Sequence, residues 1–141
     1  REALESLRGF DEIFIDTPPA VNFFTRSALI AAERCLIPFD CDSFSRRALY
    51  LLLDNVREMQ ADHNRGLRVE GIVVNQFQSQ ARLPRQLVEE LRAEGLPVLD
   101  AFLSTSVKIR ESHERALPML HLDPRHKLTQ EFEALYGLLA A

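Results

Sequence analysis

The stretch that decides the fold is FDEIFIDTPPA, residues 10–20, in which a short apolar run ends on an acid and two prolines follow. Proline fixes φ and has no backbone N–H, so the chain must leave a sheet at Pro18 and Pro19. We therefore predict a strand over residues 12–15, with Asp16 at its carboxyl end. Ligands bind at the carboxyl ends of the strands in a parallel α/β sheet, so Asp16 is a candidate site residue.

An acid followed by threonine and a rigid loop is typical of one half of a nucleotide site. Asp16 can hold Mg²⁺ through water, and the loop that begins at Thr17 and Pro18 can respond to a γ-phosphate. The alternative is that Asp16 only caps the following turn, but the Thr-Pro-Pro context favours the metal. The other half, a G-x-x-x-x-G-K-[ST] loop, does not occur in the 141 residues, whose five glycines are scattered.

The start of the chain bears on its domain organisation. Because it begins at Arg1, shortly before the expected strand, we interpret residues 1–141 as the carboxyl-terminal portion of a single larger domain. A composition that is 46% apolar and 27% charged indicates a soluble globular fold, and a net charge of −4 gives no general attraction to nucleic acid. The apolar runs are too short to cross a bilayer, so we expect a cytoplasmic protein.

Helical and strand patterns alternate along the chain, which predicts an α/β fold with a mostly parallel sheet flanked by helices. Further strands are expected over residues 34–39, 69–75 and 97–103. Helices are expected over residues 22–32 (mostly buried), 43–61, 83–93, 106–116 and from 123 onward. Pro38 should close the second strand, and Asn75 should be the last residue of the third. Ser43 or Ser45 should cap the long helix, and Gly95 should follow the helix over 83–93.

These blocks resemble the ParA/MinD-type P-loop ATPases with a deviant Walker A motif, and more closely the ParA/Soj partition branch. The resemblance is carried by residues 10–19, 28–32 with 36–38, 69–75, 107–112 and 122–125. It implies a P-loop NTPase-like fold, ATP and Mg²⁺ as cofactors, and an ATPase that closes into a homodimer when ATP is bound. This segment lacks the P-loop, so we expect it to be inactive by itself.

The resemblance also implies roles for individual residues. Asp16 would be the Walker B acid that coordinates Mg²⁺ through water, with Thr17 and Pro18 at the start of the switch. Asn75 matches a position that contacts the adenine base in many relatives; the alternative is an asparagine that only forms a turn. The lysines, threonine and acid that act on the phosphates lie outside this segment in the family pattern, so we assign no catalytic residue here.

Lys108 and Arg110 occupy the block in which partition ATPases carry DNA-contacting basic residues. Contacts to phosphates give affinity without sequence readout, so such binding would be nonspecific. The alternative is a solvated helix face, because Glu111 and Glu114 are close enough along a helix to pair with these cations. Where relatives often have Ile-Pro-Arg, this chain has Leu103-Ser104-Thr105, which removes one basic residue and a loop proline.

The resemblance implies a function in plasmid or chromosome partitioning, with nonspecific DNA and a ParB-like protein as partners and a nucleoid-associated location. The tail over residues 131–141 has no basic face, so membrane binding is not expected. Two alternatives stay open. One is a ParA-like ATPase that positions a cargo other than DNA, and the other is a non-catalytic scaffold module that has lost the nucleotide site.

Overall fold

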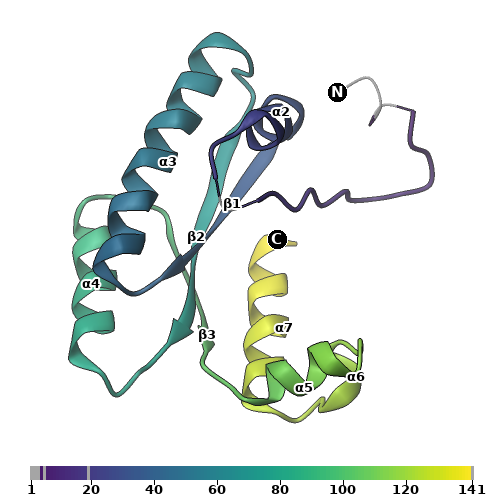
Figure 1. Cartoon of the computed structure of the whole chain (residues 1–141), viewed down its shortest axis with the longest axis vertical. Helices are drawn as coiled ribbons and strands as arrows, with labels where there is room; N and C mark the ends of the chain where they lie inside the picture. Colours follow the sequence, from purple (N-terminus) through teal and green to yellow (C-terminus); the bar gives the residue numbers. More distant parts are fainter. Residues whose placement is uncertain (1–3, 5, 19, 141) are drawn as a thin grey trace. The chain divides into compact units, whose positions relative to one another are not determined.

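The computed structural model describes residues 4, 6–18 and 20–140 (Figure 1). The elements in chain order are α2 (Phe23–Ala31), β1 (Arg34–Asp40), α3 (Ser43–Asp62), β2 (Arg68–Phe77), α4 (Arg82–Ala93), β3 (Val98–Ser104), α5 (Lys108–Glu114), α6 (Met119–Leu122) and α7 (Lys127–Leu139). The three strands form one parallel sheet in the order β1-β2-β3, and helices flank it. The predicted α/β class with a parallel sheet is therefore confirmed.

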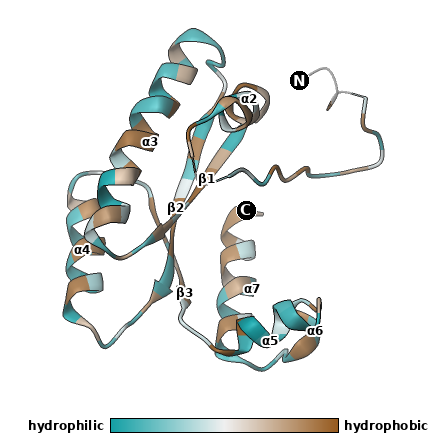
Figure 2. Ribbon diagram, viewed as in Figure 1, coloured by the Kyte–Doolittle hydropathy of each residue, from teal (hydrophilic) through white to brown (hydrophobic). Residues whose placement is uncertain are grey.

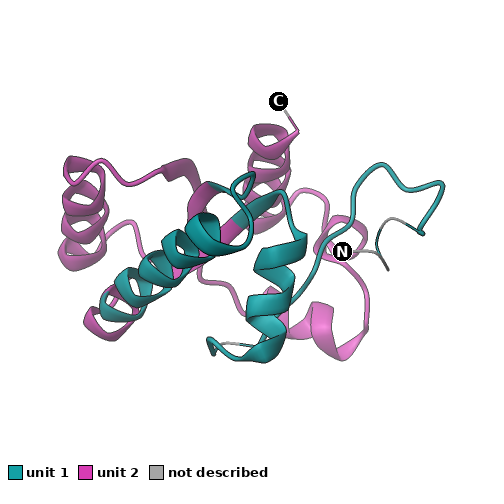
Figure 3. Ribbon diagram, turned by 90° about the horizontal axis from the view of Figure 1, so that it is seen from above, with its two compact units in different colours: residues 1–35, 47–69 teal, residues 36–46, 70–141 magenta. Residues whose placement is uncertain are grey.

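The chain divides into two compact units, which Figure 3 colours separately. The first unit comprises residues 1–35 and 47–69, and the second comprises residues 36–46 and 70–141. The boundaries fall inside β1, α3 and β2, so each of these elements gives residues to both units. Each unit has buried side chains of its own.

Helices α2 and α3 supply the core of the first unit. Its buried side chains are Leu29, Val56, Met59 and Leu67. Along α3 the buried residues are Leu49, Leu53, Val56 and Met59. Asn64 closes the end of α2, because its Nδ2 donates to the carbonyl oxygens of Leu29 at 2.9 Å and Ala32 at 2.7 Å. These are carbonyls that a helix cannot satisfy internally, so Asn64 fixes where α2 ends.

The core of the second unit lies between β3 and α7. Its buried side chains are Val73, Ala101, Leu103, Met119, Leu128 and Leu135. Helix α7 packs against β3, and α6 packs against both α5 and α7. Strands β2 and β3 are parallel, with Ile72 opposite Val98 and an irregularity between Val74 and Phe77. This packing holds β2, which carries Asn75 near its carboxyl end.

The strand predicted over residues 12–15 is wrong. In the described residues the sheet contains β1, β2 and β3 alone, and residues 12–18 are extended chain outside it. A strand requires a neighbour that accepts its backbone hydrogen bonds, and no described segment pairs with this one. Phe10 and Phe14 are accordingly 70% and 78% exposed. The apolar pattern of residues 12–15 therefore does not suffice to place them in the sheet.

Helix α2 forms where expected but is not mostly buried. Asn22 caps it, accepting from the backbone N–H groups of Phe24 at 3.0 Å and Thr25 at 3.1 Å. Phe23 and Phe24 are 76% and 67% exposed, and the buried residues of the helix are Thr25 and Leu29. The density of apolar residues predicted the helix, but it did not predict which of them pack.

Several boundaries also differ from the prediction. Strand β1 continues through Pro38 to Asp40, which is tolerated because β1 lies at the edge of the three-stranded sheet and needs no N–H there. Strand β2 continues past Asn75 to Phe77, so Asn75 is not its last residue. The short helix α6 was not predicted, and α7 begins at Lys127 rather than near residue 123. Gly95 follows α4 with φ of 78°, as expected for a residue at C′.

Candidate nucleotide site

Asp16 lies in the exposed extended segment of the first unit that leads into α2. Thr17 is half-buried and Pro18 is exposed, whereas Pro19 lies outside the described residues. The carboxylate of Asp16 is a hard oxygen donor of the kind that Mg²⁺ prefers. In the described chain, no group of three His, Cys, Asp or Glu side chains could hold a metal. A Mg²⁺ ion held by Asp16 would take its other ligands from water and phosphate oxygens.

The loop after the Thr-Pro-Pro motif is tied to the first turn of α2 by a buried threonine. Thr25 Oγ1 donates to the carbonyl oxygen of Ala20 at 2.6 Å and lies 3.5 Å from that of Pro18. The amide oxygen of Asn22 caps the same turn. A change of position at this loop would thus be passed to α2, which is what a switch requires.

Asn75 lies half-buried in β2 of the second unit, and its amide contacts the end of β1. Asn75 Nδ2 donates to Asp40 Oδ1 at 3.1 Å, and Gln76 Nε2 donates to Asp40 Oδ2 at 3.0 Å. Two consecutive side chains of β2 therefore reach one carboxylate. The structure brings together Asn75, which the sequence singled out, with Asp40 and Gln76, which it did not.

Gln76 has an unusual backbone conformation that makes this arrangement possible. Successive side chains of a regular strand point to opposite faces of the sheet. In a regular strand, Asn75 and Gln76 could therefore not both reach Asp40. Gln76 has φ of 49°, in the left-handed region that non-glycine residues rarely occupy. Its carbonyl oxygen accepts a hydrogen bond from Thr105 Oγ1 at 3.1 Å, which helps to hold this turn in place.

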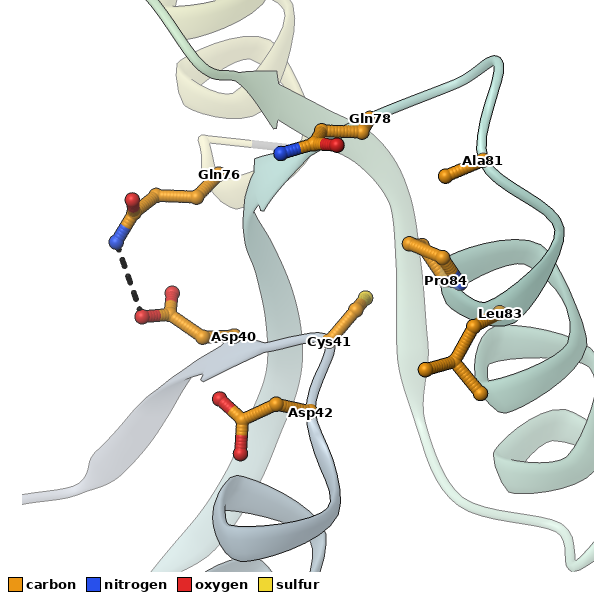
Figure 4. A pocket seen from close by; sticks show the side chains of 8 residues that line it. All are labelled: Asp40, Cys41, Asp42, Gln76, Gln78, Ala81, Leu83 and Pro84. Carbon is orange, nitrogen blue, oxygen red and sulfur yellow. Dashed lines mark hydrogen bonds between the residues drawn. The ribbon is translucent and has the colours of Figure 1, made fainter.

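A cavity of about 410 Å³ opens beside these residues at the carboxyl ends of β1 and β2 (Figure 4). Its lining residues are Asp40, Cys41, Asp42, Gln76, Gln78, Ala81, Leu83 and Pro84. In Figure 4 the side chain of Asp40 points toward Gln76, with the hydrogen bond between them dashed. Burial, followed by the charges of Asp40 and Asp42, raises the pKa of the Cys41 thiol to about 11. Cys41 is therefore a neutral thiol at neutral pH.

Asp42, rather than Ser43 or Ser45, caps the start of α3. Asp42 Oδ1 accepts from the backbone N–H of Ser45 at 2.8 Å, and Asp42 Oδ2 accepts from Ser45 Oγ at 2.9 Å. These hydrogen bonds, that to the backbone first, hold the pKa of Asp42 below its usual value. Asp42 thus has a structural task, whereas Asp40 faces the amides of β2.

The predicted DNA-contacting residues lie on α5, which is mostly hydrophilic in Figure 2. Lys108 Nζ lies 3.0 Å from Glu111 Oε2, and the hydrogen bond from Lys108 holds the pKa of Glu111 below its usual value. Arg115 pairs with the same glutamate at 2.8 Å. Arg110 is exposed. Helix positions two apart point about 200° away from each other, so Lys108 and Arg110 do not share a face.

The loop that departs from the Ile-Pro-Arg pattern is held by α7. Glu131 accepts from the backbone N–H of Ser104 at 2.7 Å and from its hydroxyl at 2.6 Å. Lys127 Nζ lies 3.0 Å from Ser104 Oγ and 3.4 Å from the Glu131 carboxylate. The end of β3 is therefore anchored to α7 by hydrogen bonds from Ser104 to Glu131, and Lys127 forms an ion pair with the same glutamate.

Comparisons with known proteins bear on the class of this site. A family model described as an AAA domain matches residues 1–69. The chain is 31% identical over 137 residues to the chromosome partitioning protein ParA of Myxococcus xanthus, covering 96% of this chain and 48% of that protein. It is 28% identical over 127 residues to the chromosome-partitioning ATPase Soj of Treponema pallidum, covering 89% and 50%. Among solved structures it matches cobyrinic acid a,c-diamide synthase from Mycobacterium smegmatis with a TM-score of 0.69 and 25% identity, covering 89% and 54%.

The parallel sheet with flanking helices and the likeness to that synthase define a P-loop NTPase-like fold. Within that fold, the relatives in the comparison are partition proteins. The resemblance to the ParA-type partition ATPases is therefore confirmed over most of the chain. The chain spans about half the length of the curated relatives that it matches. In the described part, no helix is both long and apolar enough to cross a membrane.

Proposed function

We propose that this chain is part of a ParA-like ATPase, an ATP-dependent dimerisation switch that acts in plasmid or chromosome partitioning. The observation that carries the proposal is the similarity to partition proteins over 96% of the chain, which includes the Asp-Thr-Pro-Pro motif at residues 16–19. Asp16 holds Mg²⁺ through water, and Asn75 contacts the adenine base. The phosphate-binding loop belongs to the part of the full-length protein outside these 141 residues.

The residues of this chain have two tasks in the proposed function. They bind the nucleotide and its metal ion, and they pass a movement of the loop to α2. Asp16 would orient the water ligands of a bound Mg²⁺ ion, whose charge would offset that of the nucleotide phosphates. The loop from Thr17 to Ala20 follows directly, and Thr25 ties that loop to α2. A movement of this loop caused by the γ-phosphate would therefore be passed to α2, through the chain itself and through the hydrogen bond of Thr25. Hydrolysis requires the groups of the missing loop, so the segment alone is inactive.

Magnesium-dependent ATP binding by the full-length protein tests this assignment. We expect Asp16→Ala to abolish most of the gain in ATP affinity that Mg²⁺ gives, a loss of at least roughly tenfold, since a charged group bound to the ion's water shell is removed. Asp11→Ala is the matched control, because Asp11 is also an exposed acid in the same extended segment. Isothermal titration with and without Mg²⁺ measures the effect. Equal loss in both variants, or none in either, would contradict the role of Asp16.

A ParA-like ATPase with a cargo other than DNA is a second candidate, and contacts in the second unit favour it. Glu111 pairs with both Lys108 and Arg115, so one of the two predicted DNA-contacting cations, Lys108, already has an acidic partner within α5. Binding of the ATP-loaded dimer to DNA of arbitrary sequence distinguishes the two candidates. Binding supports the partition ATPase, and its absence supports a cargo other than DNA. If the protein is a partition ATPase, its partners are nonspecific DNA and a ParB-like protein. Its location is then the cytoplasm, in association with the nucleoid.

A further inference from the structure

Asp40 ends β1 at the point where two neutral amides of β2 approach its carboxylate. Each oxygen of Asp40 takes one hydrogen bond, from Asn75 Nδ2 at 3.1 Å and from Gln76 Nε2 at 3.0 Å. All three residues belong to the second unit. Ligands of α/β proteins bind at this end of the strands, so the contact lies where a nucleotide is expected.

The chemistry of the pair gives Asn75 a defined orientation. A carboxylate only accepts hydrogen bonds, whereas a primary amide has an accepting oxygen and a donating nitrogen. Asp40 therefore holds the nitrogen end of the Asn75 amide. The oxygen, on the other arm of the same planar group, is turned away from Asp40. No hydrogen bond from the described residues reaches that oxygen, and the side chain is half-buried, so the oxygen is available to a ligand.

The backbone supports the view that this orientation is built in rather than incidental. Gln76 has φ of 49°, a conformation that costs a non-glycine residue free energy. That turn lets Gln76 occupy the second oxygen of Asp40, which leaves Asn75 the first. With both oxygens engaged, Asp40 cannot swing away from Asn75 without losing a hydrogen bond.

We propose that Asp40 is a positioning residue that sets the base preference of the site by holding the Asn75 amide with its oxygen toward the ligand. The inference rests on the proposed function, in which Asn75 contacts the base. An amide oxygen accepts a hydrogen bond from the 6-amino group of adenine. It repels the 6-oxo group of hypoxanthine or guanine, because both oxygens are acceptors. The site therefore selects 6-aminopurine nucleotides, and Asp40 maintains the selection without touching the nucleotide.

The test compares ATP with inosine triphosphate, which has the same ribose and phosphates but a 6-oxo purine. In the full-length protein, Asp40→Asn gives position 40 both a donor and an acceptor, so either orientation of Asn75 is satisfied. We expect the ratio of the two dissociation constants to move toward one by roughly five- to tenfold, the effect of about one hydrogen bond. Asp54→Asn is the matched control, because Asp54 pairs with Arg57 on the exposed face of α3 and should leave the ratio unchanged.

The outcomes separate this inference from the proposed function. If Asp40→Asn binds ATP but keeps the wild-type ratio, or weakens both nucleotides equally, Asp40 only joins β1 to β2 and the inference is wrong. If the wild-type protein binds neither nucleotide, the proposed function itself fails. Asn75→Ala provides a second measurement should Asp40→Asn fail to fold. It removes the oriented oxygen and should likewise erase the preference, and a preference that survives it would overturn the inference.

Discussion

At the scale of single residues, Asp42 shows how a side chain beside the candidate site serves the fold. It accepts two hydrogen bonds from Ser45 and so caps α3. We expect Asp42→Ala to lower the free energy of unfolding by about 1 kcal/mol, as is usual for loss of an N-cap, and Asp42→Asn to lower it by much less. Urea unfolding at pH 7 measures both. Equal stability of the alanine variant and the wild type would show that the cap does not contribute.

The same cap predicts a dependence on pH. Hydrogen bonds lower the pKa of Asp42 in the folded state, so its contribution is present above the unfolded pKa of about 3.9. The contribution is lost as the pH falls through the lower, folded value. The stability difference between the wild type and Asp42→Ala should therefore shrink below about pH 4. A difference that stays constant down to pH 3 would mean that the charged form has no advantage as a cap.

Residue-level chemistry was only partly predictable from the sequence. Asn75 could be singled out because it ends an apolar, β-branched run. Asp40 gives the same signal, an acid at the carboxyl end of a strand, but the strand predicted over residues 34–39 ends one residue before it. Gln76 could not have been found, because its contact with Asp40 depends on a left-handed turn inside β2. No local pattern of the sequence announces that turn.

At the scale of elements, the pairing of β2 with β3 depends on a glycine. A Cβ atom at Gly71 would lie within 2.5 Å of Leu99 Cδ2. We expect Gly71→Ala to lower the free energy of unfolding by roughly 1–3 kcal/mol, because Leu99 must move from its place in a packed region. Adding Leu99→Ala should recover part of that loss, and the double-mutant cycle measures the coupling. Simple additivity of the two substitutions would contradict a direct clash.

Elements with a strong local pattern were predicted well, except for one strand that finds no partner among the described residues. Helices α3 and α4 form within about two residues of their expected bounds, because periodicity and the glycine at residue 95 are local signals. Residues 12–15 carry an equally clear strand pattern but lie outside the sheet. A strand takes its hydrogen bonds from a neighbour, so its pattern alone does not determine whether it pairs.

At the scale of the whole molecule, the two units divide the proposed tasks. The first unit contains Asp16 and the loop that Thr25 ties to α2, and the second contains Asn75, Asp40 and the basic block of α5. We expect both tasks only in the full-length protein, which supplies the phosphate-binding loop. In the proposed function, MgATP drives the full-length protein from monomer to dimer.

Sedimentation equilibrium of the full-length protein, with and without MgATP, tests that claim most directly. We predict that wild-type protein shifts from monomer to dimer when MgATP is added, and that Asp11→Ala behaves in the same way. Asp16→Ala should stay monomeric at the same nucleotide concentration, because it cannot hold the Mg²⁺ ion that orders the switch. If MgATP leaves the wild-type mass unchanged, the protein is not an ATP-dependent dimerisation switch, and the scaffold alternative takes its place.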